Sequence, residues 1–115
     1  MPKILLAEDD PTMVALLKTL LTIEGFEVVT ILDKAGDPVE NIRREKPDVV
    51  LLDVYLGEQD GVELVRQMRQ VPELKSVKVV MTSGMNKVDE CLEAGADDFL
   101  LKPYMPDDLI RRIRH

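Results

Sequence analysis

The chain contains few aromatic residues, a single cysteine and no long apolar run. Phe and Tyr each occur twice and Trp is absent, so a core must come from the aliphatic residues that dominate the 45% hydrophobic fraction. The single Cys91 rules out an internal disulfide framework and favours a reducing compartment. The apolar residues between Lys3 and Glu8 are too few for a signal peptide, and no segment reaches the roughly 20 residues that span a bilayer. We therefore expect a cytoplasmic protein without membrane contact.

Basic residues are also in the minority. The sequence has 15 Lys and Arg residues against 22 Asp and Glu residues, which gives a net charge of −7 and an isoelectric point near 4.7. This balance argues against direct binding of nucleic acid or of an anionic membrane by this chain. A length of 115 residues, without an internal repeat, linker or low-complexity segment, predicts one domain over residues 1–115.

The most informative stretch is the apolar run between Asp48 and Asp53. Two valines and two leucines follow one another there without a polar residue. A strand with one face in water alternates apolar and polar residues, whereas a continuous run is typical of a parallel strand buried on both faces. Such a strand is central in a sheet covered by helices. It delivers Asp53 to its carboxyl end, where ligands bind in open α/β sheets.

Five segments of strand character alternate with five segments of helical character. The sequence therefore predicts a doubly wound α/β fold, with a five-stranded parallel sheet and helices on both faces. The predicted strands are Lys3–Ala7, Phe26–Ile31, Asp48–Asp53, Val77–Met81 and Asp97–Leu101. The predicted helices begin after Asp10, Asp37 and Asp60 and near Val88 and Leu109, and the first four are closed by Gly25, Pro47, Pro72 and Gly95.

Polar residues collect where the predicted strands end. If these strands are parallel neighbours, their ends meet at one crevice. Several carboxylates there repel one another unless a cation joins them, and Mg²⁺ prefers oxygen ligands of this kind. A lysine and a hydroxyl complete the set needed to hold a phosphoryl group, with Asp53 as the nucleophile that forms an aspartyl phosphate. The residues concerned are Glu8, Asp9, Asp10, Asp53, Thr82 and Lys102.

Four motifs in this order resemble those of the receiver domain of bacterial two-component response regulators. The resemblance covers essentially the whole chain. It implies a flavodoxin-like (βα)5 fold with strand order 2-1-3-4-5. It also implies a regulatory phosphoacceptor domain rather than an enzyme that turns over a substrate. The motifs are Ile4–Pro11, Pro47–Leu56 with Asp60 and Gly61, Val79–Ser83, and Gly95–Pro103.

The resemblance assigns the acceptor and the metal ligands. Asp53 would receive a phosphoryl group from a phosphohistidine of a sensor histidine kinase or phosphotransfer protein. Mg²⁺ would be the cofactor, bound by the side chains of Asp9 and Asp53 and by the carbonyl of Tyr55, with Glu8 acting through water. Asp10 is left open between capping a helix and binding the metal.

The resemblance also assigns a switch and an output surface. Thr82 and Lys102 would contact the phosphoryl group, and Thr82 with Phe99 would form the switch. The surface that changes would be the face of the fourth helix, fifth strand and last helix, roughly residues 86–94 with Phe99 and Tyr104. This face would control an output domain or effector protein, and a homodimer through it is left open.

The chain departs from the family at Gly57, and three other functions compete with the phosphoacceptor interpretation. The family often has Pro where Gly57 stands, so a looser loop is expected after Asp53. A haloacid-dehalogenase-like phosphohydrolase needs an acid two residues after its nucleophile, where this chain has Tyr55. A flavodoxin-like cofactor binder needs a hydroxyl- and glycine-rich loop where Glu8 and the next two acids stand. A pseudo-receiver would not need Asp53 or its basic and hydroxyl partners.

Taken singly, these residues also have ordinary structural explanations. The acids after Ala7 suit a helix N-terminus, and Asp53 could simply cap a loop. Thr82 could be a buried hydroxyl bonded to backbone, and Lys102 a solvated loop charge. Phe99 and Cys91 fit a hydrophobic core. Only the combination of all four motifs favours the phosphoacceptor interpretation.

Overall fold

The computed structural model describes residues 1–31 and 36–114. Its strands are β1 (Lys3–Ala7), β2 (Glu27–Thr30), β3 (Val49–Asp53), β4 (Tyr55–Leu56), β5 (Gln59–Asp60), β6 (Lys78–Ser83) and β7 (Asp98–Leu101). Its helices are α1 (Pro11–Ile23), α2 (Pro38–Glu45), α3 (Gly61–Met68), α4 (Val88–Ala94) and α5 (Pro106–Arg114), with a short 3-10 helix η1 at Pro72–Leu74.

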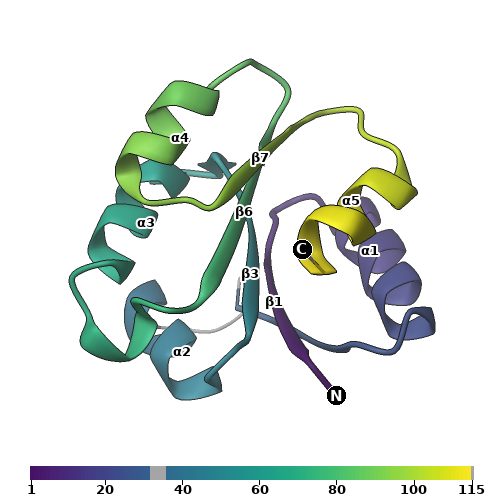
Figure 1. Ribbon diagram of the computed structural model, residues 1–115, viewed down its shortest axis with the longest axis horizontal. Helices are drawn as coiled ribbons and strands as arrows, with labels where there is room; N and C mark the ends of the chain where they lie inside the picture. Colours follow the sequence, from purple (N-terminus) through teal and green to yellow (C-terminus); the bar gives the residue numbers. More distant parts are fainter. Residues whose placement is uncertain (32–35, 115) are drawn as a thin grey trace.

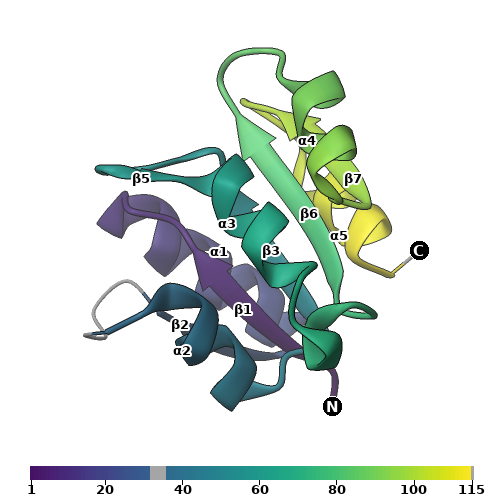
Figure 2. The same ribbon diagram turned by 90° about the vertical axis from the view of Figure 1, so that its left-hand side faces the viewer.

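A parallel sheet of five strands forms the middle layer of the molecule (Figure 1). Its order is β2-β1-β3-β6-β7, and each neighbouring pair is parallel. Since β6 and β7 are the fourth and fifth strands of this sheet along the chain, this is the predicted order 2-1-3-4-5. Helices α2, α3 and α4 cover one face, and α1 and α5 cover the other (Figures 1 and 2). The predicted doubly wound fold is confirmed.

Strand β3 is buried on both faces, as its apolar run predicts. Val50 and Leu52 pack into the cluster beneath α2, α3 and α4, while Val49 and Leu51 pack into the cluster beneath α1 and α5. All four side chains are at most 6% exposed. Burial of each contributes about 1.5–3 kcal/mol, so β3 links the two halves of the core and fixes where Asp53 ends up.

Three aspartates start helices in the way that the sequence predicts. Asp10, Asp37 and Asp60 each accept a hydrogen bond from the backbone N–H two residues later, at 2.9, 3.1 and 2.9 Å. A cap of this kind stabilises a helix by about 1 kcal/mol. The role of Asp10 that the sequence left open is therefore capping of α1.

Three short elements were not predicted. Strands β4 and β5 pair antiparallel, with Tyr55 opposite Asp60 and Leu56 opposite Gln59, and they form a hairpin between β3 and α3. The looser loop expected at Gly57 stays a prediction. The 3-10 helix η1 lies between α3 and β6.

Two leucines at helical spacing face outward. Leu16 of α1 is 62% exposed and Leu92 of α4 is 47% exposed. Leu16 lines a groove of about 450 Å³ between α1 and the segment after β7, together with Tyr104 and Pro106. Within the described ranges 1–31 and 36–114, no helix is long and apolar enough to cross a bilayer.

Candidate functional site

The polar residues predicted at strand ends do meet at the carboxyl edge of the sheet, the upper edge in Figure 1. Asp53 is the last residue of β3 and lies directly opposite Thr82 of the neighbouring strand β6. Both are buried, with 8% and 3% of their surface exposed. Thr82 lies inside β6 because that strand continues beyond the predicted end at Met81. Lys102 follows β7 on the far side of β6.

Lys102 joins two carboxylates that come from different strands. Its Nζ donates to Asp53 Oδ2 at 2.5 Å and to Glu8 Oε1 at 2.9 Å. Glu8, which follows β1, is 6% exposed. Its other oxygen accepts the backbone N–H groups of Asp9 and Asp10 at 3.0 and 3.3 Å. A solvated loop position for Lys102 is thereby excluded, since this ammonium group bridges β1 and β3 to the end of β7.

The pKa values of both Glu8 and Lys102 are raised in this bridge, but for different reasons. Burial raises the pKa of Glu8, and its bonds to Lys102 and to the Asp10 backbone only partly offset that cost. Burial alone would lower the pKa of Lys102, but the bonds to Asp53 and Glu8 outweigh it and raise the pKa. The lysine stays charged, while Glu8 carries a cost for remaining ionised. A second cation would relieve that cost.

The acidic residues fit a divalent metal ion. Among the described residues, Glu8, Asp9 and Asp53 each offer a carboxylate oxygen within 4.8 Å of the others. Asp9 is exposed, whereas the other two are buried, so the cluster opens to solvent on one side. Hard oxygen donors with room for water suit Mg²⁺. Asp10 is not part of this cluster, in agreement with its capping role.

The segment after β3 supplies two backbone donors to the same carboxylates. Tyr55 N–H donates to Asp53 Oδ1 at 3.0 Å, and Gly57 N–H donates to Asp9 Oδ2 at 2.8 Å. Figure 2 shows the β4–β5 hairpin lying beside the turn that follows β1. Sequence reasoning missed the Gly57 contact because it joins residues 48 positions apart. The metal-binding carbonyl assigned to Tyr55 stays a prediction.

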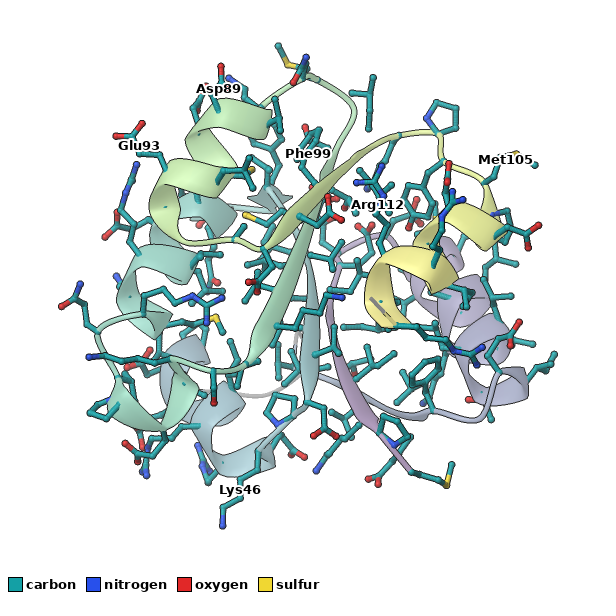
Figure 3. All side chains as sticks on the ribbon, in the orientation of Figure 1. Lys46, Asp89, Glu93, Phe99, Met105 and Arg112 are labelled. Atoms are coloured by element: carbon teal, nitrogen blue, oxygen red, sulfur yellow. The ribbon has the colours of Figure 1, made fainter. Side chains whose placement is uncertain are left out.

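Phe99 lies in β7 on the side of the sheet that α4 covers (Figure 3). It is 9% exposed and packs in the same cluster as Cys91 and Ala94 of α4. Burial raises the pKa of the Cys91 thiol to about 11, so the thiol is protonated at neutral pH and behaves as a core residue. A hollow of about 450 Å³ runs along the outer side of β7 and is lined by Phe99, Tyr104 and Arg112, among others.

The chain belongs to the response regulator receiver domain family, whose sequence pattern it matches over residues 4–114. The phosphate regulon transcriptional regulatory protein PhoB of Rhizobium meliloti is 36% identical over an alignment of 118 positions, which covers 99% of this chain and 51% of PhoB. The chemotaxis protein CheY of Bacillus subtilis is 30% identical over 114 residues, which cover 96% of this chain and 93% of CheY. The chain thus spans about half the length of the transcriptional regulators that it matches.

A solved structure adds a bound metal to this comparison. The receiver domain of a sensor histidine kinase from Pseudomonas aeruginosa superposes with a TM-score of 0.84 at 28% identity, covering 98% of this chain and 94% of that one. In that structure a magnesium ion is coordinated in the active-site cleft. The present chain has a fitting acidic cluster.

Proposed function

We propose that this chain is a phosphoacceptor switch in which Asp53 receives a phosphoryl group, in a Mg²⁺-dependent step, from a phosphohistidine of a sensor histidine kinase or phosphotransfer protein. The observation that carries the proposal is the position of Asp53. It ends a doubly buried strand, and it is bonded to Lys102 and clustered with Glu8 and Asp9. Family membership supports the same assignment.

The transfer is an in-line displacement at phosphorus. An oxygen of Asp53 forms the new P–O bond while the P–N bond of the phosphohistidine breaks, and its electron pair returns to the imidazole, which takes a proton from the surrounding water. The protein then has to stabilise an acyl phosphate beside Glu8. Lys102, which is bonded to Asp53, supplies a positive charge, and Thr82, which lies opposite Asp53 in β6, supplies a hydroxyl donor.

Mg²⁺ would be held by the side chains of Asp9 and Asp53 and by the carbonyl of Tyr55, with Glu8 acting through water. Mg²⁺, when bound, would supply the positive charge that allows phosphoryl oxygens to approach this acidic cluster. The side chains that this chain contributes lie within 4.8 Å of one another, which supports the assignment.

Thr82 and Phe99 connect the acceptor to the surface. A phosphoryl group on Asp53 draws the Thr82 hydroxyl towards it, and Phe99, which already packs beside α4, turns further into the vacated space beside β6. The exposed Gly84 follows β6 and takes up the backbone change at low cost. The face formed by α4, β7 and α5 then differs between two states that are separated by a few kcal/mol.

This face acts on a protein partner in the cytoplasm rather than on a substrate. The partner is an output domain, an effector protein or a second copy of the chain. Catalysis is limited to phosphorylation and dephosphorylation of the chain itself. A haloacid-dehalogenase-like hydrolase is disfavoured because Tyr55 stands where that chemistry needs a second acid, and direct nucleic-acid binding is disfavoured by the net charge of −7.

The proposal is tested by incubating the protein with a small phosphodonor such as phosphoramidate. The intact mass is followed with Mg²⁺ present and, in parallel, with the metal removed by a chelator. We expect one added phosphoryl group with Mg²⁺, localised to Asp53 by fragmentation, and little addition without the metal. Absence of any addition at high donor and Mg²⁺ concentration, or addition at another residue only, would contradict the proposal.

A further inference from the structure

Gly57 makes a long-range contact with the candidate metal site. Its N–H donates to Asp9 Oδ2 at 2.8 Å, from the tip of the β4–β5 hairpin to the turn after β1. Gly57 has φ +60°, a left-handed value that favours glycine. A Cβ built at this position would meet only Asp9 Oδ2, at 3.9 Å, so space does not dictate the glycine. Its backbone conformation, which aims the N–H at Asp9, does.

The hairpin that carries Gly57 is anchored at its base. Gly61 N–H donates to the Val54 carbonyl at 2.7 Å, and a Cβ on Gly61 would lie 2.2 Å from the Asp53 carbonyl oxygen, so the backbones there touch. Leu56 is 4% exposed and packs into the core beneath α2, α3 and α4. The tip is therefore held in place over Asp9 by contacts that do not involve Asp9.

Asp9 needs such a contact more than its two neighbours do. Glu8 and Asp53 are buried and bonded to Lys102, whereas Asp9 is an exposed side chain in the same cluster. Repulsion from two carboxylates within 4.8 Å favours rotamers that turn an exposed carboxylate out to water. A hydrogen bond to one oxygen opposes that rotation and leaves the second oxygen available. Metal-ligating carboxylates are commonly held by such outer partners.

We propose that Gly57 is a positioning residue of the metal site: its N–H holds Asp9 in the cluster, so that Mg²⁺ affinity depends on the β4–β5 hairpin. This inference rests on the proposed function, because it takes the cluster to bind Mg²⁺. The dependence is reciprocal. If the hydrogen bond strengthens metal binding, bound metal strengthens the hydrogen bond and protects the Gly57 amide from exchange by the same factor.

The direct test removes the N–H without changing any side chain. Gly57→glycolate, made by chemical ligation of the full chain, replaces that N–H with an ester oxygen. Gly25→glycolate is the matched control, because Gly25 also has positive φ and its N–H donates to the Thr22 carbonyl, at the opposite edge of the sheet. Mg²⁺ dissociation constants are measured by calorimetry. We expect about 10- to 100-fold weaker binding for Gly57→glycolate and a change within about twofold for the control.

Amide hydrogen exchange of the unmodified protein gives a second readout that needs no variant. Saturating Mg²⁺ should slow exchange at Gly57 by about tenfold or more. Suppose that the unmodified protein binds Mg²⁺. The positioning role would then be overturned by equal Mg²⁺ affinity in the two glycolate variants, or by a Gly57 exchange rate that does not change with Mg²⁺. Failure of the unmodified protein to bind Mg²⁺ would instead contradict the proposed function.

Discussion

Strand β3 is flanked by two aspartates whose surroundings are opposite in kind. At the amino edge of the sheet, Asp48 accepts the Lys3 N–H at 2.7 Å, and the Lys3 ammonium group pairs with Glu45 at 3.0 Å. At the carboxyl edge, Asp53 shares the single Lys102 with Glu8 and lies within reach of Asp9. The acids around Lys3 at the amino edge are exposed or half-buried, whereas two of the three acids clustered at the carboxyl edge are buried. We infer that the first arrangement serves stability and the second serves chemistry.

The largest expected difference between the two edges is in phosphoryl incorporation after replacement of Asp53 or Asp48. Asp53→Ala should abolish phosphoryl incorporation from a small phosphodonor with Mg²⁺, because it removes the nucleophile. Asp48→Ala should retain it, since Asp48 faces the other edge. Intact mass measurement distinguishes the two variants. Unchanged incorporation in Asp53→Ala would place the acceptor elsewhere.

The amino edge should show the largest loss of stability. Arg69 donates to the carbonyls of Leu74, Val77 and Gly95 at 2.8, 2.8 and 2.9 Å and pairs with Asp97 at 3.1 Å. Arg69→Ala leaves several of these acceptors unpaired, so the free energy of unfolding should fall by about 3 kcal/mol.

Urea denaturation measures this loss, and Mg²⁺ affinity should not change in Arg69→Ala. The matched control is Arg66→Ala, which removes an exposed arginine whose one ion pair among residues 1–31 and 36–114 is with Glu63 of the same helix, at 3.4 Å. That change should stay within about 0.5 kcal/mol. Equal losses in the two variants would mean that the cluster around Arg69 adds nothing to stability.

Adjacent acids at the carboxyl edge should separate metal binding from helix capping. Asp9→Ala should weaken Mg²⁺ binding about tenfold or more, as loss of a ligand costs at least what loss of an outer partner costs. It should leave the metal-free fold as stable as before or slightly more so, because like-charge repulsion falls.

Asp10→Ala should behave in the reverse way. It removes the cap of α1 and costs about 1 kcal/mol of stability, while Mg²⁺ affinity is retained. Calorimetric metal titration and urea denaturation are run on both variants. If Mg²⁺ affinity follows Asp10 rather than Asp9, the metal ligands have been assigned wrongly.

The smallest expected effect is a pH dependence at Glu8. Burial raises the pKa of this carboxyl above its ordinary value of 4.5, so the folded chain holds the proton more tightly than the unfolded chain does. This group therefore favours folding most at pH below 4.5, and its contribution falls as the pH rises from 4.5 through the raised folded pKa.

Glu8→Gln should remove that fall. Urea denaturation of the metal-free proteins between pH 4 and 7 should show the difference in stability between variant and wild type changing over this window. A difference in stability that stays constant with pH would mean that folding does not raise the pKa of Glu8.

The sequence predicted which residues meet at the carboxyl edge, but it did not predict the contacts that hold them there. The unbroken run before Asp53 is typical of a doubly buried strand, and the parallel topology then brings Thr82 and Lys102 to the same edge. Apolar periodicity also marked Leu16 and Leu92, which the fold leaves exposed, because spacing alone does not say how wide the buried stripe of a helix is.

The missed features depend on contacts between distant segments. The β4–β5 strands have two residues each, too few to show a period of two. Arg69 bonds to the carbonyls of Leu74 in η1, of Val77 just before β6 and of Gly95 just after α4, and only the folded chain brings these groups together. The Gly57–Asp9 bond also joins distant segments. Its one sign in the sequence is a glycine that follows Tyr55-Leu56 and precedes Glu58-Gln59.

The central claim, that the carboxyl edge both accepts a phosphoryl group and transmits its presence, is tested most directly by backbone amide shifts. Beryllofluoride and Mg²⁺ are added to the labelled protein as a mimic of phosphorylated Asp53. We expect shifts at residues 8–11 and 53–57 and through residues 84–105, including Phe99, with little change around Lys3 and Asp48 at the amino edge. Shifts confined to residues 8–11 and 53–57 would show a site that binds the mimic without transmitting, and would contradict the account.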